Sequence, residues 1–362
     1  MTAPPPARLG YDDLTPQKVL DALDAVGQRG DGRILQLNSY ENRVFQVFLE
    51  DGSAVVTKFY RPGRWSDAQI LEEHAFALEL AEAEVPVVPP LTLFTTLGEP
   101  PADVPGAPTA PSTSGLAPVL LGQPPTLARW AGHRYAVAAR CAGREPELDQ
   151  VDVLERIGGF IGRLHAVGRR CAFAHRHRLD AARDGERARA VLLEGDFIPA
   201  DQAGAWERAA EVALAAVGAA FERAAPLATL RLHGDCHIGN ILWRDQREGG
   251  SFGGAHVVDL DDAMQGPAVQ DLWMLASGDS STQQRRLDRL LEGYEAHNTF
   301  DWRECALVEP LRTLRMLRHS AWLAERWSDP TFPIHFPFFG SSAYWSQQTA
   351  QLHEQVELMQ AG

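Results

Sequence analysis

Three polar residues in the second half of the chain have the types and the order that transfer of a phosphoryl group requires. Asp235 follows His-Gly, Asn240 lies five positions later, and Asp259 comes after two valines. In such a transfer, one carboxylate orients the attacking hydroxyl and takes its proton, while an amide oxygen and a second carboxylate hold Mg²⁺ against the phosphates of ATP. We therefore predict Asp235 as the catalytic base, and Asn240 and Asp259 as Mg²⁺ ligands, with Asp259 essential for catalysis.

The elements around these residues are expected to bring the two metal ligands together. The apolar run 240–243 is typical of a short strand, 246–254 is a glycine-rich turn, and 256–258 is typical of the returning strand. Asn240 and Asp259 then lie near the open end of a hairpin and can converge on one ion.

The segment His-Gly-Asp is a weak signal by itself, because Asp and Asn are common in turns. Its interpretation as a catalytic loop depends on the later Asn240 and Asp259, and on a lysine and a glutamate upstream. His233 is expected to hold this loop rather than to exchange protons, since Asp235 already suits an alcohol that needs only late deprotonation.

The upstream lysine is Lys58, in the middle of the β-branched run 54–60, which predicts a strand. Alternation along a strand directs its ammonium along a buried face, where it needs a counter-charge. The helical run 66–83 offers Glu72 and Glu73, and we favour Glu73 as the partner, with Glu72 as the alternative. A solvated lysine at the edge of a sheet is the competing interpretation.

A further candidate lies in the segment 36–47, which is expected to form a strand, a turn and a second strand where kinases cover the phosphates of ATP. The segment lacks the Gly-x-Gly-x-x-Gly pattern that lets a backbone approach phosphate closely. Ser39 could offer its hydroxyl and the neighbouring backbone N–H groups instead.

Longer strings along the chain resemble the stress response kinase A family, which are bacterial Ser/Thr protein kinases in the aminoglycoside phosphotransferase and choline kinase branch of the kinase-like fold. The resemblance rests on Asn-Ser-Tyr-Glu-Asn-Arg-Val at 38–44, Lys-Phe-Tyr-Arg-Pro at 58–62, Leu-Arg-Leu-His-Gly-Asp-Cys-His at 230–237, Val-Asp-Leu-Asp-Asp at 258–262, Gly-Pro-Ala-Val-Gln-Asp-Leu-Trp-Met at 266–274 and Glu-Pro-Leu-Arg at 309–312. His-Gly-Asp and the metal-binding Asp mark the wide superfamily, whereas the other strings point to this one family.

The resemblance implies an α+β, bilobal protein-kinase-like fold, with a small β-rich first lobe and a larger, mainly helical second lobe. It implies ATP as co-substrate, Mg²⁺ as cofactor and Ser or Thr of a protein as acceptor. Autophosphorylation, in which the enzyme is its own acceptor, is to be tested. It also implies a cytoplasmic monomer with a role in surviving stress.

The resemblance also assigns roles to single residues. It gives the base and both Mg²⁺ ligands the roles predicted above, and it adds contact of Ser39 with ATP and of Lys58 with the α- and β-phosphates. Asp271 would support the backbone of the catalytic loop. Capping of a helix that begins near Leu272 is an equally physical account of Asp271.

The length of the chain, 362 residues, predicts two lobes rather than one average domain. We expect a nucleotide-binding lobe over 1–138, a hinge over 139–150 and a helical catalytic lobe over 151–362. The segment 98–125 is rich in Pro, Ala, Ser, Thr and Gly, so we expect a disordered insertion there.

Composition argues against several classes of partner. The net charge of −14 opposes binding to nucleic acid or to anionic membranes. No apolar run approaches the ~20 residues that cross a bilayer. The 4 cysteines form no Cys-x-x-Cys pair, which is typical of reduced thiols in the cytosol.

Three classes of function remain open from the sequence. A protein Ser/Thr kinase is favoured by the family-specific strings. A small-molecule kinase that acts on an amino alcohol, a sugar or an aminoglycoside is the alternative, because one fold serves many acceptors. A nucleotide-binding scaffold without catalysis is disfavoured, because the base and both metal ligands are present.

Overall fold

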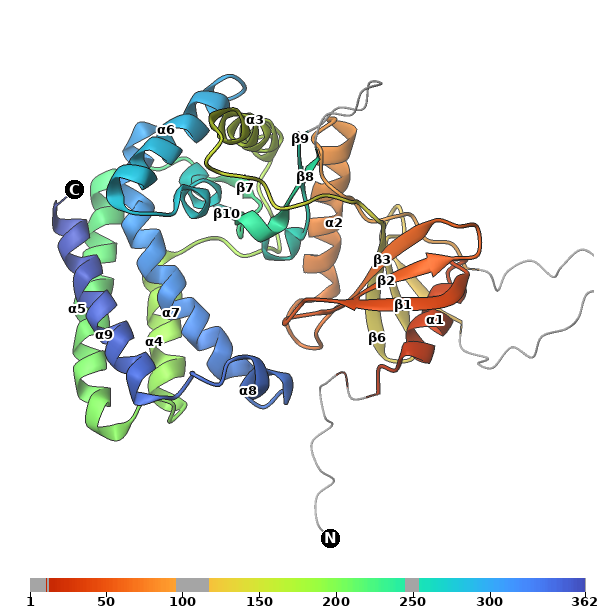
Figure 1. Cartoon of the computed structure of the whole chain (residues 1–362), viewed down its shortest axis with the longest axis horizontal. Helices are drawn as coiled ribbons and strands as arrows, with labels where there is room; N and C mark the ends of the chain where they lie inside the picture. The colour runs from red at the N-terminus through yellow and green to blue at the C-terminus, as the bar shows by residue number, and fades with distance from the viewer. Residues whose placement is uncertain (1–10, 12, 96–116, 245–253, 362) are drawn as a thin grey trace, which may run out of the picture. The chain divides into compact units, whose positions relative to one another are not determined.

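The computed structural model describes residues 11, 13–95, 117–244 and 254–361, and the chain divides into two compact units. The first unit contains Met1–Gly143 and His256–Asp261, and the second contains Arg144–Ala255 and Asp262–Gly362. The first is built around a β-sheet and the second is mainly helical (Figure 1). The expected α+β class, with a β-rich first lobe and a mainly helical second lobe, is thereby confirmed.

Six antiparallel strands form the sheet of the first unit, in the order β1-β2-β3-β6-β5-β4. Their bounds are β1 Gly30–Leu37, β2 Arg43–Leu49, β3 Ala54–Phe59, β4 Val119–Leu121, β5 Leu127–Trp130 and β6 His133–Ala139. Lys58 lies on β3, with Val44 of β2 on one side and Ala136 of β6 on the other. Lys58 is therefore not an edge residue.

One helix covers each face of this sheet. Helix α1, Pro16–Asp24, packs Val19 and Leu23 into a core with the face of β3 that carries Val55 and Phe59. Helix α2, Asp67–Glu82, packs on the opposite face, where Ile70 joins Tyr60, Leu127 and Ala136 in a second cluster. Alternation along β3 puts Lys58 on this second face, so the lysine and helix α2 lie on the same side of the sheet.

The start of α2 is fixed by its own sequence. The Ser66 hydroxyl accepts from the backbone N–H of Gln69 at 3.3 Å, and the Gln69 side-chain oxygen accepts from the backbone N–H of Ser66 at 2.9 Å. This reciprocal capping satisfies two N–H groups that a helix otherwise leaves unpaired. It sets the register in which Glu73 falls on the buried side of the helix.

The prediction of a disordered insertion over 98–125 is wrong for the C-terminal end of this segment. Residues 119–121 form strand β4, which pairs with β5 at the edge of the sheet. Val-Leu-Leu is an apolar run that a sheet edge can hold, whereas the composition averaged over the whole segment is dominated by Pro, Ser and Gly. Residues 98–116 of the predicted segment lie outside the described residues.

The short segment His256–Asp261 belongs to the first unit, although the sequence placed it with the helical lobe. The backbone explains this difference, because Val257 forms a parallel bridge with Val87 and its N–H donates to the carbonyl of Pro86 at 3.0 Å. The segment follows β9, Gly254–Val257, which pairs with β8, Ile241–Arg244, as the sequence predicted. Residues 246–253 of the expected glycine-rich turn lie outside the described residues.

The second unit is built from seven helices among its described residues. Their bounds are α3 Val151–Gly168, α4 Ala181–Glu194, α5 Ala200–Ala224, α6 Ser280–Glu295, α7 Val308–Arg326, α8 Thr331–His335 and α9 Ser342–Ala361. Helices α4, α5, α7 and α9 share one large core, in which Trp206 and Trp345 are fully buried. Two short antiparallel strands, β7 Leu230–Leu232 and β10 Met264–Gly266, lie in the same unit.

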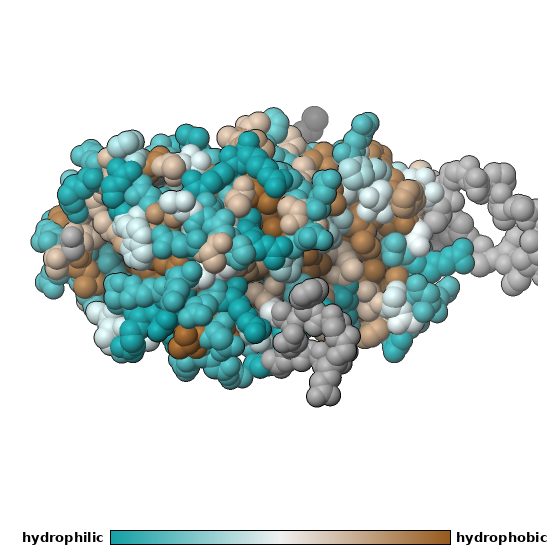
Figure 2. Space-filling view, turned by 90° about the horizontal axis from the view of Figure 1, so that it is seen from above, coloured by the Kyte–Doolittle hydropathy of each residue, from teal (hydrophilic) through white to brown (hydrophobic). Residues whose placement is uncertain are grey.

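No helix within the described parts of the chain is long and apolar enough to cross a membrane. Hydrophilic residues cover most of the face shown in Figure 2, with hydrophobic residues interspersed.

Helices α3 and α6 meet at glycines, and this contact gives a stability prediction. A Cβ at Gly158 would lie 1.9 Å from the backbone carbonyl oxygen of Leu290. We expect Gly158→Ala to lower the free energy of unfolding by about 1–3 kcal/mol, the usual range for overpacking. Denaturant unfolding measures the change.

The matched control is Gly218→Ala in helix α5, where a Cβ would meet nothing within 4 Å. This change should raise the free energy of unfolding by about 0.5–1 kcal/mol, because alanine is the better helix former. Equal destabilisation by both changes would contradict the close approach of α3 and α6.

Candidate active site

The His-Gly-Asp segment forms a loop directly after strand β7 in the second unit. Gly234 has a φ of +87°, and a Cβ there would lie 2.1 Å from the backbone carbonyl oxygen of Asp262. Only glycine tolerates both the conformation and the close approach. The glycine thus lets the chain turn sharply, so that Asp235 follows immediately after a buried strand.

A buried carboxylate holds the backbone of this loop. Asp271 is fully buried at the end of a 3₁₀ turn, Ala268–Asp271, and accepts from the backbone N–H groups of His233 at 2.7 Å and Gly234 at 2.8 Å. Its Oδ2 also lies 3.1 Å from Nε2 of His165. The next turn, Trp273–Ala276, has no side-chain cap. Support of the loop is therefore the observed contact of Asp271, and helix capping is not.

Neighbouring side chains complete the support of the loop. His165 is fully buried on α3, and its Nδ1 lies 3.1 Å from the hydroxyl of Tyr294. Nδ1 of His233, also fully buried, accepts from the backbone N–H of Asp235 at 3.3 Å. Gln270 donates to the carbonyl of Gly234 at 2.8 Å. Both histidines thus make hydrogen bonds inside the protein.

Asn240 ends a short 3₁₀ turn, Ile238–Asn240, and is tied to the same loop. Its side-chain NH₂ donates to the backbone carbonyl of Asp235 at 2.9 Å. Because the nitrogen is engaged in this way, the amide oxygen is the atom that remains as a ligand for a cation. Within the described residues this oxygen accepts no hydrogen bond.

Asp235 is paired with two basic side chains of its own unit. Arg315 of helix α7 donates to its Oδ1, and Nε2 of His237 lies 3.5 Å from its Oδ2. Burial alone would raise the pKa of Asp235, but the hydrogen bond from His237 and the charge of Arg315 outweigh it and hold the pKa well below its usual range. The Asp235 carboxylate is therefore ionised at neutral pH.

The sequence analysis did not find Arg315. This residue lies 80 positions beyond Asp235, and no local spacing connects the two. The only signal in the sequence is the series Arg312, Arg315 and Arg318 on one amphipathic helix.

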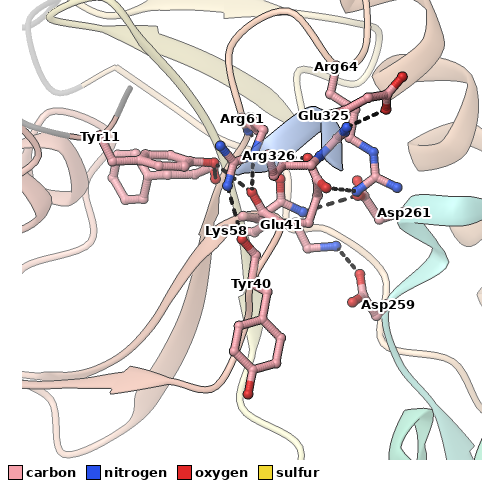
Figure 3. A network of polar contacts seen from close by, with 12 residues as sticks. Tyr11, Tyr40, Glu41, Lys58, Arg61, Arg64, Asp259, Asp261, Glu325 and Arg326 are labelled. Carbon is pink, nitrogen blue, oxygen red and sulfur yellow. Dashed lines mark hydrogen bonds and ion pairs between the residues drawn. The ribbon is translucent and has the colours of Figure 1, made fainter. Parts of the chain in front are cut away.

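In the first unit, Lys58 pairs with Asp259 (Figure 3). Nζ of Lys58 lies 2.5 Å from Oδ1 of Asp259. Burial alone would lower the pKa of Lys58, but the charges of Asp259, Asp261 and Glu73 raise it. Glu73 is buried on α2 and acts on the ammonium in this way. The ion pair of Lys58 is thus with Asp259, and Glu73 remains the predicted partner of Lys58 on α2.

Asp259 is partly exposed and has an unusual backbone conformation. Its side chain is 46% exposed, and its φ of +64° lies in the left-handed region that few residues other than glycine adopt. No cluster of three or more His, Cys, Asp or Glu side chains that could hold a metal occurs in the described parts of the chain.

A buried network holds the segment that carries Asp259. Asp261 is buried and accepts from the side-chain NH₂ of Asn42 at 3.1 Å. Its Oδ2 lies 2.9 Å from the guanidinium of Arg64 (Figure 3). The sequence analysis gave no role to Asn42 or Arg64. Both belong to the connections that flank β2 and β3, so the network ties these connections to the segment that contains Asp259.

The same network reaches the turn that carries Ser39. The Arg61 side chain donates to the backbone carbonyls of Glu41 at 2.9 Å and Tyr40 at 3.0 Å, and its Nε lies 3.0 Å from the carboxylate of Glu41 (Figure 3). Ser39 lies in this connection between β1 and β2 and is half-buried. Among described residues its hydroxyl has no recorded hydrogen bond, and the turn beside it is fixed by Arg61.

The phosphotransferase enzyme family model matches residues 33–308 of the chain. The chain belongs to this family. It is a kinase, as the sequence analysis predicted.

Named relatives match almost the whole length of the chain. Stress response kinase A of Salmonella choleraesuis (strain SC-B67) is 41% identical over 349 residues, which cover 96% of this chain and 94% of that protein. Serine/threonine protein kinase RdoA of Salmonella typhimurium (strain LT2) is also 41% identical over 349 residues, with the same coverage of 96% and 94%. Stress response kinase A of Escherichia coli (strain K12) is 40% identical over 350 residues, which cover 97% of this chain and 95% of that protein.

Solved structures of other kinases share the fold. Amicoumacin kinase hAmiN, solved with AMP-PNP, Ca²⁺ and Ami, superposes with a TM-score of 0.64 at 19% identity and covers 96% of this chain and 93% of its own. A microcompartment-associated aminopropanol kinase gives a TM-score of 0.62 at 15% identity and covers 96% of this chain and 97% of its own. At such identities the likeness concerns the fold alone.

The support of the loop by Asp271 gives a testable prediction. Asp271→Asn places an NH₂ group or a neutral oxygen where two backbone N–H groups and a histidine now meet a carboxylate. We expect the free energy of unfolding to fall by about 1–3 kcal/mol, the range for a buried polar group that loses its partner. We also expect slower phosphoryl transfer from the fraction that remains folded. Denaturant unfolding and a transfer assay measure the two effects.

Asp149→Asn is the control, because Asp149 is almost fully exposed and pairs only with Arg286 at 2.7 Å among the described residues. It should change stability by less than about 0.5 kcal/mol. If Asp271→Asn behaved like this control, the buried carboxylate would have no role in holding the loop.

Proposed function

We propose that this chain transfers the γ-phosphoryl group of Mg·ATP to Ser or Thr of protein substrates, in a response to stress. The observation that carries the proposal is the loop after β7, in which the buried Asp271 fixes the backbone beside an ionised Asp235 and Asn240 is bound to the same loop. The names of the relatives that match almost the whole chain support a protein acceptor and a stress role.

In the proposed reaction, each functional residue acts through an atom whose surroundings are known. The Asp235 carboxylate accepts a hydrogen bond from the Ser or Thr hydroxyl and finally takes its proton. The hydroxyl oxygen forms a bond to the γ-phosphorus, the bond from that phosphorus to the bridging oxygen breaks, and ADP leaves with the electron pair. His233 and Asp271 keep the loop in place during this exchange.

The remaining residues bind the nucleotide. Lys58, supported by the charge of Glu73, holds the α- and β-phosphates, and the turn at Ser39 covers the phosphates with its hydroxyl and backbone N–H groups. Asn240 and Asp259 supply side-chain oxygens to Mg²⁺. When bound, Mg²⁺ neutralises the charge that develops on the phosphate oxygens.

The alternative is a kinase for a small alcohol. Solved structures with the same fold include an amicoumacin kinase and an aminopropanol kinase. A fold does not fix which acceptor an enzyme uses. A cationic acceptor of that kind needs acidic side chains near the base. In the described part of the second unit, however, the side chains that contact the carboxylate of Asp235 are Arg315 and His237.

We further propose that the enzyme works in the cytoplasm as a monomer and that it phosphorylates itself as well as other proteins. Its net charge of −14 and its cysteines without a Cys-x-x-Cys pair support a cytoplasmic location. Nucleic acid and membranes are not expected partners.

Removal of the base should slow the reaction strongly. We expect Asp235→Ala to lower kcat by about 10²–10⁴-fold, the usual contribution of a positioned acid or base. The affinity for ATP should stay within a few-fold of wild type. Transfer of labelled γ-phosphate to a mixture of Ser/Thr-containing proteins measures the effect, and a loss smaller than tenfold would argue against the role of Asp235.

Removal of the metal-binding charge should abolish transfer for a different reason. Asp259→Asn should remove Mg·ATP-dependent transfer, while the melting temperature without nucleotide stays close to that of wild type. The exposed position of Asp259 is the reason for expecting an intact fold. Titration of Mg²⁺ against transfer rate, together with thermal unfolding, tests both parts. Unchanged turnover would refute the assignment of Asp259.

A further inference from the structure

One face of helix α7 carries positive charge beside the proposed base. Arg315, Arg318, His319 and Trp322 are spaced by three and four residues, so they form one stripe along the helix. The contact of Arg315 with Asp235 fixes this stripe next to the catalytic loop, within the same unit. The stripe therefore borders the place where an acceptor hydroxyl must lie.

The charges on this stripe are available to a ligand. The Arg315 side chain is 43% exposed, compared with 24% for Asp235, so the guanidinium is more accessible than the carboxylate that it contacts. Arg318 has no ion pair or hydrogen bond with any residue that the structure describes, although its charge acts on Asp184. Asp184 is itself bound by His177 at 2.8 Å.

The other members of the stripe add no negative charge. His319 is exposed and its ring packs against Trp322, with 5.6 Å between ring centroids. The nearest acidic residue along α7 after Trp322 is Glu325, which already pairs with Arg187 at 2.9 Å and Arg326 at 2.7 Å. The exposed stripe itself thus carries two arginines and no acidic residue, although the whole chain carries −14.

This distribution of charge has a consequence for the acceptor. An acceptor with a positive group near its hydroxyl would meet two arginines within one helical turn. A carboxylate would instead form charge-assisted hydrogen bonds with them, and an arginine can bind a carboxylate through two parallel N–H groups. Binding of the acceptor carboxylate would move Arg315 away from Asp235. The Asp235 carboxylate would then accept a hydrogen bond from the acceptor hydroxyl.

We propose that the acceptor Ser or Thr is flanked by an acidic residue, whose carboxylate is bound by Arg315 and Arg318. The proposal rests on the protein kinase function above and adds the class of its substrate. Arg315 is then a specificity-determining residue that occupies the base until an acidic acceptor replaces it. Because Arg315 contacts the base directly, the acidic residue must lie close to the acceptor Ser or Thr.

The test uses degenerate peptide libraries centred on Ser, in which one position near the Ser is fixed as Glu, Gln or Lys. The wild-type enzyme, with Mg·ATP, should phosphorylate the Glu library with a kcat/KM about tenfold or more above that of the Lys library, the scale of a charge-assisted hydrogen bond. The Gln library should lie between them. Equal rates on all three, or a preference for Lys, would overturn the proposal.

Variants of Arg315 separate recognition from catalysis. Arg315→Gln should raise KM for the Glu library to the level of the Gln library. The change in kcat on the Gln library should be much smaller. Arg315→Lys should restore part of the preference for the Glu library. Arg318→Gln should act in the same direction but less strongly. A fall in kcat by the same factor on all three libraries would instead place Arg315 in the chemical step and would contradict acceptor recognition.

The matched control is Arg289→Gln on helix α6. Arg289 is 46% exposed and pairs with Glu292 at 2.6 Å, so it resembles Arg315 in exposure and pairing but is not part of the α7 stripe. The control should leave the preference for Glu unchanged. A lack of transfer to every library and to a whole-protein mixture, with ATP still bound, would refute the protein kinase function itself and the inference with it.

Discussion

The buried carboxylate of Asp271 is the contact on which the catalytic half of this structure depends. Two consecutive backbone N–H groups, from His233 and Gly234, point at one fully buried side chain. A buried carboxylate is stable only when hydrogen bonds replace its water, and here the loop itself supplies them. The loop and the carboxylate therefore stabilise each other. Asp235 inherits its position from this arrangement, and Asn240 does so through its bond to the carbonyl of Asp235.

Each carboxylate that the proposed reaction needs is paired with a cation of its own unit. Asp259 is paired with Lys58 in the first unit, and Asp235 is paired with Arg315 in the second. The charge of Arg315 helps to hold the pKa of Asp235 below its usual range, which suits a base that must be ionised. The two pairs also mean that ligands must compete with existing partners, so the charge of a ligand decides how well it binds. The hydrogen bonds and ion pairs around Asp261 also connect the turn near Ser39 to the segment that contains Asp259.

The sequence predicts those parts of the structure that depend on local patterns. Alternation and β-branching located the strand of Lys58, the helical run 66–83 located α2, and His-Gly-Asp marked the loop. Arg315 and Asn42 were missed, because they meet their partners across 80 and 219 positions of the chain. Such pairs follow from tertiary packing and leave no local spacing to detect. The end of the 98–125 segment was misjudged for a related reason, since pairing with β5 outweighs its average composition.

The most direct test of the central claim is to find which molecule receives the γ-phosphate. Purified enzyme is incubated with Mg²⁺ and labelled ATP in the presence of a protein mixture, amino alcohols and aminoglycosides together, and the label is located by mass. The account predicts label on Ser or Thr of proteins, which disappears in the Asp235→Ala variant. Label on a small alcohol, with proteins unlabelled, would contradict the account.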